Sequence, residues 1–220
     1  MIQLACASLC AEGFKDSSFA RTMEMVPAAG YSHVEFNLWH ARSVLPHAVD
    51  RLAAQCAEAG LQTAAAYGTS VGSPANRPDL DLGHKLWMME VASRLGCSRV
   101  VFSGVPRGGT GTLEAAINTL NLLAPHAEER GVSICLENHA GATLENIEDY
   151  QRLFEAVPSS AVGLCIDTGH FEAASVSLDD VTEQLGERVN HIHVKENHGT
   201  GKVDFRRFGE GTTDNNLVEE

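Results

Sequence analysis

Three residues that can bind a metal ion stand at or near the C-terminal ends of three consecutive apolar runs. The residues are Glu137, Asp167 and His193. The runs cover 132–139, 162–170 and 190–197. Two carboxylates and one imidazole suit a divalent ion such as Mn²⁺, Mg²⁺, Co²⁺ or Zn²⁺. Any one residue alone is more readily explained by local hydrogen bonding, but three at one height of a sheet favour a shared site for one divalent metal ion.

The alternation within these runs indicates where the side chains point. In the run 190–197, Ile192 and Val194 take one face, while the other face carries His191, His193 and Lys195. Successive side chains of a strand face opposite sides, so each strand packs apolar residues on helices and turns small or ionisable residues the other way. This pattern is typical of the lumen of a barrel.

The elements that must position these residues alternate along the whole chain. We expect strands at 1–10, 33–38, 61–67, 98–105, 132–139, 162–170 and 190–197. Helices are expected at 17–29, 46–59, 79–95, 112–130, 146–156 and 177–189. The spacing of about thirty residues is that of one βα unit, and the alternation implies a parallel sheet. A doubly wound open sheet is the competing layout, but its central strands would be apolar on both faces.

The sequence therefore predicts a single α/β domain over residues 1–220, a TIM (β/α)8-type barrel with seven parallel strands. A complete barrel of this type has eight strands and about 250 residues. We expect a C-terminally truncated barrel with strand eight missing, and Asp214 as the cap of a helix that has just begun. Strands one and seven would then be edges, either open or paired with another chain, and little activity is expected from these 220 residues.

Charge and composition exclude several kinds of protein. The net charge is −13, and a nucleic-acid-binding protein needs a basic face. The N-terminus lacks the basic region of a signal peptide and no later segment could span a membrane, so we expect a cytoplasmic protein with no membrane partner. Six cysteines without a Cys-x-x-Cys pair are interpreted as free thiols.

The chain resembles the xylose isomerase-like TIM barrels, the superfamily of sugar (phosphate) isomerases and epimerases and of AP endonuclease family 2. The resemblance is carried by Leu-Glu-Asn-His at 136–139, Asp-Thr-Gly-His at 167–170, His-Ile-His-Val-Lys-Glu at 191–196 and Gly-Glu-Gly-Thr-Thr-Asp at 209–214. It implies that Glu137, Asp167 and His193 are three of four metal ligands. It also implies that His170 contacts the substrate and that Lys195 lines the same pocket. The fourth ligand in the family is a glutamate on strand eight.

Two branches of this family can be compared with the sequence. AP endonucleases carry extra histidines at the ends of strands three and four, where this chain reads Ala-Ala-Tyr-Gly at 65–68 and Val-Phe-Ser-Gly at 101–104. This difference and the acidic charge argue against DNA repair. Ketohexose 3-epimerases have a second Glu and an Arg at the positions of Thr143 and Gly199. We therefore expect the substrate to be held differently from that branch.

The resemblance implies a divalent-metal-dependent isomerase or epimerase acting on a sugar, a sugar phosphate or a keto acid. Glu137 would remove the proton next to a carbonyl and leave an enediolate. A metal-dependent dehydratase of a keto-cyclitol and a catalytically vestigial barrel remain as alternatives. The sequence also allows a homo-oligomer. Glu35 is interpreted as a hydrogen-bonded lumen residue. The glycine-rich loop 107–111 could cradle a phosphate, but a lone loop of this kind is weak evidence.

Overall fold

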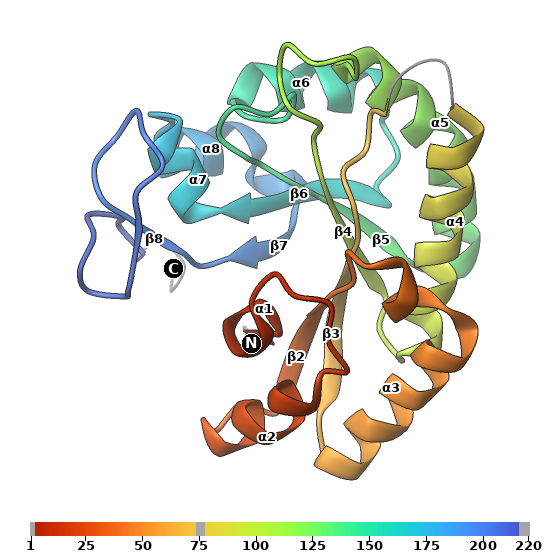
Figure 1. The fold of residues 1–220 in the computed structure, drawn as a ribbon. Coiled ribbons are helices and arrows are strands. Elements are labelled where there is room, and N and C mark those ends of the chain that lie inside the picture. The colour runs from red at the N-terminus through yellow and green to blue at the C-terminus, as the bar shows by residue number, and fades with distance from the viewer. Residues whose placement is uncertain (1–2, 74–77, 216–220) are drawn as a thin grey trace.

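The computed structural model describes residues 3–73 and 78–215. Seven parallel strands follow one another in chain order across a single curled sheet (Figure 1). They are β1 (Cys6–Ala7), β2 (His33–Asn37), β3 (Gln62–Tyr67), β4 (Arg99–Ser103), β5 (Ser133–Glu137), β6 (Val162–Asp167) and β7 (Val189–His193). Within the described ranges no strand lies between β7 and β1, which form the two edges of the sheet. The predicted seven-stranded TIM-type barrel without an eighth strand is confirmed.

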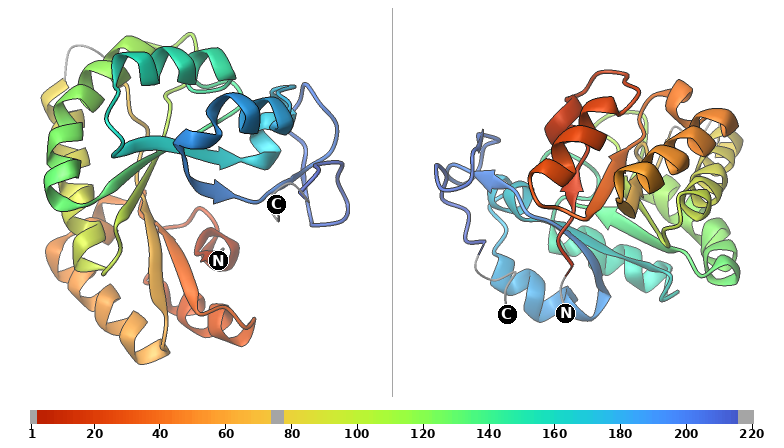
Figure 2. Two further views of the ribbon diagram at one scale, coloured as in Figure 1. Left: turned by 180° about the vertical axis from the view of Figure 1, so that it is seen from behind. Right: turned by 90° about the horizontal axis from the view of Figure 1, so that it is seen from below.

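Helices cover the outer side of the curled sheet (Figures 1 and 2). They are α2 (Ala20–Ala28), α3 (Pro46–Ala59), α4 (Pro78–Arg94), α5 (Leu113–Arg130), α6 (Ile147–Ala156) and α8 (Leu178–Leu185). Shorter segments are α1 (Leu9–Glu12), α7 (Thr168–Ala173) and the 3-10 turns η1 (Ala41–Val44) and η2 (Gly186–Arg188). No helix in the described part of the chain is long and apolar enough to cross a membrane.

Side-chain caps explain where three of the long helices begin. Thr112 accepts the N–H of Ala115 before α5, and Ser177 accepts the N–H of Asp180 before α8. Asn146 and Asp149 form a reciprocal capping box before α6. Each cap satisfies backbone N–H groups that have no partner inside the helix. All three starts are as predicted.

The two faces of the sheet differ as the alternation predicts. Phe36, Leu136 and Leu164 are fully buried on the outer face, against the helices. A separate small cluster fills the lumen and consists of Ala65, Tyr67, Val101, Cys135 and Cys165. All six cysteines are free, which confirms that expectation as well.

Several predicted boundaries are wrong, and three of them have a clear local reason. The first strand is only two residues long, because α1 begins at Leu9. The helix predicted from 17 begins at Ala20, since the hydroxyl of Ser17 accepts the N–H of Phe19, which is left-handed at a φ of 59°. The strand predicted to reach 170 ends at Asp167, whose carboxylate accepts the N–H of His170 and starts α7.

The segment after β7 also differs from its prediction. The run predicted as a strand to 197 breaks after His193, and β8 (Glu196–Asn197) pairs antiparallel with β9 (Phe205–Arg206), a stretch expected to be loop. The last turn of the predicted helix 177–189 is η2 rather than a continuation of α8. The helix expected after Asp214 lies outside the described residues.

Candidate metal centre

The three residues singled out from the sequence come together at one edge of the sheet. Glu137, Asp167 and His193 are the last residues of β5, β6 and β7. Asp167 is in register with His193, and Glu137 with Cys165. One ligand atom from each of the three lies within 4.8 Å of the other two. Parallel strands end at the same edge, so the chain topology alone places these side chains at one height.

The donor set fits a divalent cation. Two carboxylate oxygens and one imidazole nitrogen surround a small volume, and the side chains of Glu137 and Asp167 are only 3% and 0% exposed. Bonds to such an ion are about 2.0–2.4 Å long, so small side-chain rotations would bring all three donors into range. Burying two carboxylates is costly unless cations are near, and this cluster offers three donors to one cation.

The carboxylate of Glu137 faces three side chains of the centre. Tyr67 donates its hydroxyl to Glu137 Oε2 at 2.5 Å, and His193 Nδ1 lies 2.5 Å from Oε1. His139 Nδ1 lies 3.1 Å from Oε2. Burial disfavours the ionised carboxylate, but His193 and His139 outweigh it and hold the pKa of Glu137 well below its usual value. Burial and the charge of Glu137 raise the pKa of Tyr67, which therefore remains a donor.

Asp167 is held from both its backbone and its side chain. Asn138 accepts the Asp167 N–H at 2.6 Å and donates to its carbonyl oxygen at 3.0 Å. Oδ1 accepts the N–H of His170 at 2.9 Å, while Oδ2 lies 2.6 Å from the ammonium of Lys195. Burial raises the pKa of Asp167, and the ammonium of Lys195 opposes this only in part. The carboxylate is thus fixed through Oδ1, with Oδ2 turned toward a cation.

His193 lies between two carboxylates. Its Nδ1 faces Glu137, and its Nε2 lies 3.0 Å from Oε2 of Glu35. The same Glu35 oxygen lies 2.9 Å from His191 Nε2. Burial disfavours the imidazolium of His193, but Cys165, Glu35 and Glu137 outweigh it and hold the pKa well above its usual value. The interpretation of Glu35 as a hydrogen-bonded lumen residue is confirmed, and its partners are now known.

His170 and Lys195, expected to meet the substrate, lie beside these carboxylates. Ala140 N–H donates to His170 Nδ1 at 3.3 Å, which places the ring proton on Nε2. Burial, helped by the neighbouring His139 and Lys195, lowers the pKa of His170 to about 2, so the ring is neutral. Its ring lies 3.9 Å from that of His139, centroid to centroid. His170 is therefore a neutral donor at the rim of the centre.

Aromatic side chains that the sequence did not single out line the surroundings of the centre. Phe205 of β9 meets the ring of His170 at 4.8 Å, and Lys195 Nζ lies 4.7 Å from its ring centre. Trp39 packs edge-on against Tyr67 at 5.6 Å and stacks on Phe14 at 5.4 Å. Tyr67 ends an apolar run that reads as ordinary core, and the role of Phe205 depends on an unexpected hairpin. His139 belongs to the Leu-Glu-Asn-His motif at 136–139, but the sequence alone assigns it no role.

Two carboxylates anchor the segment that carries Phe205. Glu196 accepts the N–H of Gly211 at 3.1 Å and that of Gly209 at 3.4 Å. Glu172, on α7, accepts the hydroxyls of Thr212 and Thr213. Side chains of β8 and α7 thus hold the segment 198–215 in place.

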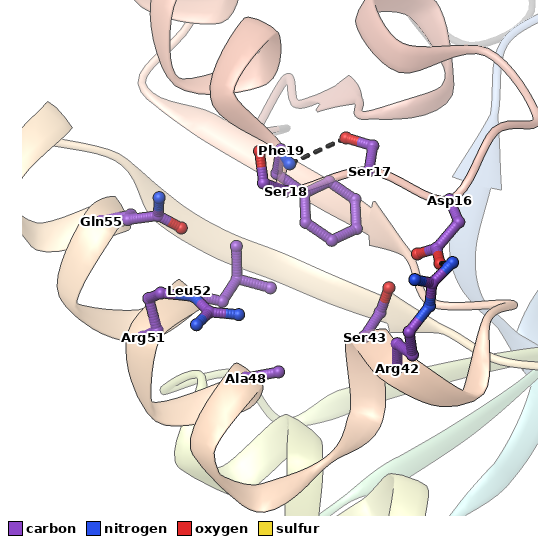
Figure 3. Close-up of a pocket in the computed structure, with 10 residues that line it drawn as sticks. All are labelled: Asp16, Ser17, Ser18, Phe19, Arg42, Ser43, Ala48, Arg51, Leu52 and Gln55. Atoms are coloured by element: carbon purple, nitrogen blue, oxygen red, sulfur yellow. Dashed lines mark hydrogen bonds and ion pairs between the residues drawn. The ribbon is translucent and has the colours of Figure 1, made fainter.

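Two other features lie apart from the centre. Arg107, in the loop considered as a phosphate cradle, is engaged by Asp149 at 2.6 Å and Glu145 at 3.2 Å. Its guanidinium is therefore paired with two carboxylates at the start of α6. A cavity of about 300 Å³ lies between α3 and the start of α2, where Arg42 pairs with Asp16 at 2.5 Å (Figure 3). It shares no lining residue with the metal centre.

Comparisons with known proteins agree with this architecture. Residues 23–219 match the family model described as xylose isomerase-like TIM barrel. The crystal structure of the IolI protein with a bound zinc atom superposes with a TM-score of 0.80, at 20% identity, over 97% of this chain and 81% of that one. A D-tagatose 3-epimerase-like protein superposes with a TM-score of 0.79, at 19% identity, over 99% and 84% of the two chains.

A shorter stretch of the chain is similar to a protein named as a dehydratase. The inosose dehydratase of Geobacillus thermodenitrificans is 31% identical over 80 residues. These cover 36% of this chain and 27% of that protein, so the match spans about a quarter of the relative's length.

Proposed function

Because the chain belongs to the xylose isomerase-like TIM barrel family, we propose that it is a divalent-metal-dependent isomerase or epimerase. Its substrate is a sugar, a sugar phosphate or a keto acid. The observation that carries the proposal is the convergence of Glu137, Asp167 and His193 at the C-terminal ends of three neighbouring strands. Proteins similar in fold are named as an epimerase-like protein and as a zinc-binding protein, which supports both the metal and the sugar.

Glu137, Asp167 and His193 would hold the metal ion. A divalent ion bound there would act as a Lewis acid and acidify the C–H next to a substrate carbonyl. The pKa of Glu137 is held low, so its carboxylate is ionised at neutral pH. It would accept that proton once the substrate displaces one of the present contacts of its oxygens. In an isomerase the protonated Glu137 would return its proton to the neighbouring carbon of the enediolate. In an epimerase a proton from solvent would reach the same carbon from the opposite face, and Glu137 would release its own proton to solvent.

Two residues next to this carboxylate would orient the substrate. His170 is neutral and carries its proton on Nε2, so it would donate to a substrate oxygen. The ammonium of Lys195, 2.6 Å from Asp167 and 4.7 Å from the ring centre of Phe205, would stabilise negative charge that develops on the substrate. The ring of Phe205 would cover an apolar face of the bound molecule.

The alternative is a dehydratase of a keto-cyclitol, supported by the inosose dehydratase match. Its first step is the same removal of a proton next to a carbonyl by Glu137. The enolate then expels the hydroxyl group of the next carbon, which leaves as water after it takes up a proton. The two functions thus share the base and differ in the fate of the enolate.

Proton NMR in deuterated water distinguishes these functions. The purified chain, loaded separately with Mg²⁺, Mn²⁺, Co²⁺ or Zn²⁺, is incubated with ketoses, aldoses, their phosphates and keto-cyclitols. We expect deuterium to replace slowly the proton next to the carbonyl of one substrate class, in keeping with the little activity expected of these 220 residues. A Glu137→Gln variant should show no exchange, because an amide cannot accept that proton. Formation of an unsaturated ketone identifies the dehydratase. Lack of exchange with every metal and substrate would favour the vestigial barrel.

A further inference from the structure

A buried carboxylate joins two strands on opposite sides of the lumen. Glu35 lies in β2, is only 4% exposed, and reaches His191 and His193 of β7. Its Oε2 lies 2.9 Å from His191 Nε2 and 3.0 Å from His193 Nε2. Glu35 is 156 positions from His191 and 158 positions from His193 in the chain. Only the curvature of the barrel brings these side chains together.

The contact determines what each nitrogen of His193 can do. A histidine that binds a metal presents the lone pair of one ring nitrogen and keeps its proton on the other. His193 Nδ1 lies toward Glu137, one of the three converging donors, at 2.5 Å. His193 Nε2 lies toward Glu35. An ionised carboxylate only accepts hydrogen bonds, so the hydrogen between these two atoms belongs to Nε2.

We propose that Glu35 is a positioning residue: it accepts the Nε2–H of His193 and thereby presents Nδ1 as the metal-binding nitrogen. The inference rests on the metal centre of the proposed function. An anionic acceptor behind a ligating imidazole fixes its tautomer and ring orientation and strengthens it as a donor. His191 holds the same Glu35 oxygen from a second direction and keeps the carboxylate in place.

One rival reading uses the same atoms. Cys165, His191 and His193 also offer ligand atoms within 4.8 Å of one another, and a second ion there would take His193 Nε2 away from Glu35. Against this reading, Glu35 Oε2 already lies within hydrogen-bonding distance of both Nε2 atoms. The burial of Glu35 also opposes its release from these donors. The two readings differ in the number of ions bound per chain.

Two matched variants separate a positioning role from a merely structural one. In Glu35→Gln a neutral amide replaces the carboxylate at nearly the same volume, and we expect Zn²⁺ affinity to fall by about 10–100-fold. In His191→Gln the second donor to Glu35 is kept in amide form and the Glu35–His193 contact is untouched. Its Zn²⁺ affinity should fall by less than about 10-fold, the lower bound for losing such a partner. Competition with a chelating dye measures both.

The decisive readout is NMR of the wild-type chain with isotope-labelled histidine and bound Cd²⁺, which needs no substrate and no variant that could misfold. We expect one Cd²⁺ per chain, coupling of cadmium to His193 Nδ1, and a proton on Nε2. Coordination through Nε2, or unchanged affinity in Glu35→Gln, would overturn the inference while leaving the proposed function standing. A second Cd²⁺ that disappears in Cys165→Ser would overturn it in favour of the rival. Failure of the wild type to bind Cd²⁺ overturns both proposals.

Discussion

The hydroxyl of Tyr67 provides a quantitative test of the charge assigned to Glu137. Tyr67 is 6% exposed and donates to the carboxylate at 2.5 Å. A Tyr67→Phe variant removes this hydroxyl and leaves the ring. A hydrogen bond to a charged group contributes about 1.5–3 kcal/mol to the free energy of unfolding, so we expect a loss in that range for the metal-free protein.

Tyr150 is a matched control for this substitution. It is fully buried and donates its hydroxyl to the carbonyl oxygen of Leu136 at 3.1 Å. The acceptor is neutral, so Tyr150→Phe should cost only about 0.5–1.5 kcal/mol. The two variants delete the same atom from two buried sites, and the difference between them reports the effect of the charge on Glu137.

Urea unfolding of both variants at neutral pH, with a chelator present, measures the two losses. We expect Tyr67→Phe to be the more destabilised protein, with an unchanged dependence on urea concentration. Equal losses, or a larger loss in Tyr150→Phe, would refute the assignment of an ionised Glu137 that accepts the phenol.

Three further predictions follow from the same contacts. The pairs of Glu35 with two imidazoles lower its pKa from an ordinary 4.5 to about 2 against the effect of burial. The extra stability of wild type over Glu35→Gln should therefore be fully present above pH 4.5 and shrink as the pH falls toward 2. Urea unfolding along a pH series measures this difference, and a difference that does not change with pH would argue against the pairs. Asp167→Asn should lower Zn²⁺ affinity at least as much as the ~10-fold expected for losing an outer partner, and calorimetry showing unchanged affinity would remove Asp167 from the centre. Glu172→Gln weakens the acceptor of the Thr212 and Thr213 hydroxyls, so trypsin should cleave the segment 198–215 faster. In the control variant Glu155→Gln, which changes an exposed residue, trypsin should cleave this segment at the wild-type rate.

The barrel and the convergence at its edge could be predicted because both follow from periods in the sequence. Alternation of apolar and polar residues in each strand determines which side chains face the lumen. The repeat of strand and helix implies a parallel sheet, so the ends of neighbouring strands meet. Glu137, Asp167 and His193 could therefore be placed together without knowing any contact.

The remaining features depend on contacts between distant parts of the chain. The β8–β9 hairpin is held by Glu196, which accepts backbone N–H groups thirteen and fifteen residues away, and its glycine-rich sequence carries no strand signal. The partners of Tyr67 and Glu35 lie 70 and 156 to 158 residues away. No local pattern reports such pairs, because the curvature of the whole sheet creates them.

Anomalous X-ray diffraction from crystals soaked in Mn²⁺ or Zn²⁺ tests the central claim most directly. The account predicts one anomalous peak per chain at about 2.0–2.4 Å from a carboxylate oxygen of Glu137, a carboxylate oxygen of Asp167 and Nδ1 of His193. Crystals of the Asp167→Asn variant soaked in parallel should show a weaker peak. Absence of the peak in wild-type crystals, or a single peak elsewhere in the chain, would contradict the metal centre.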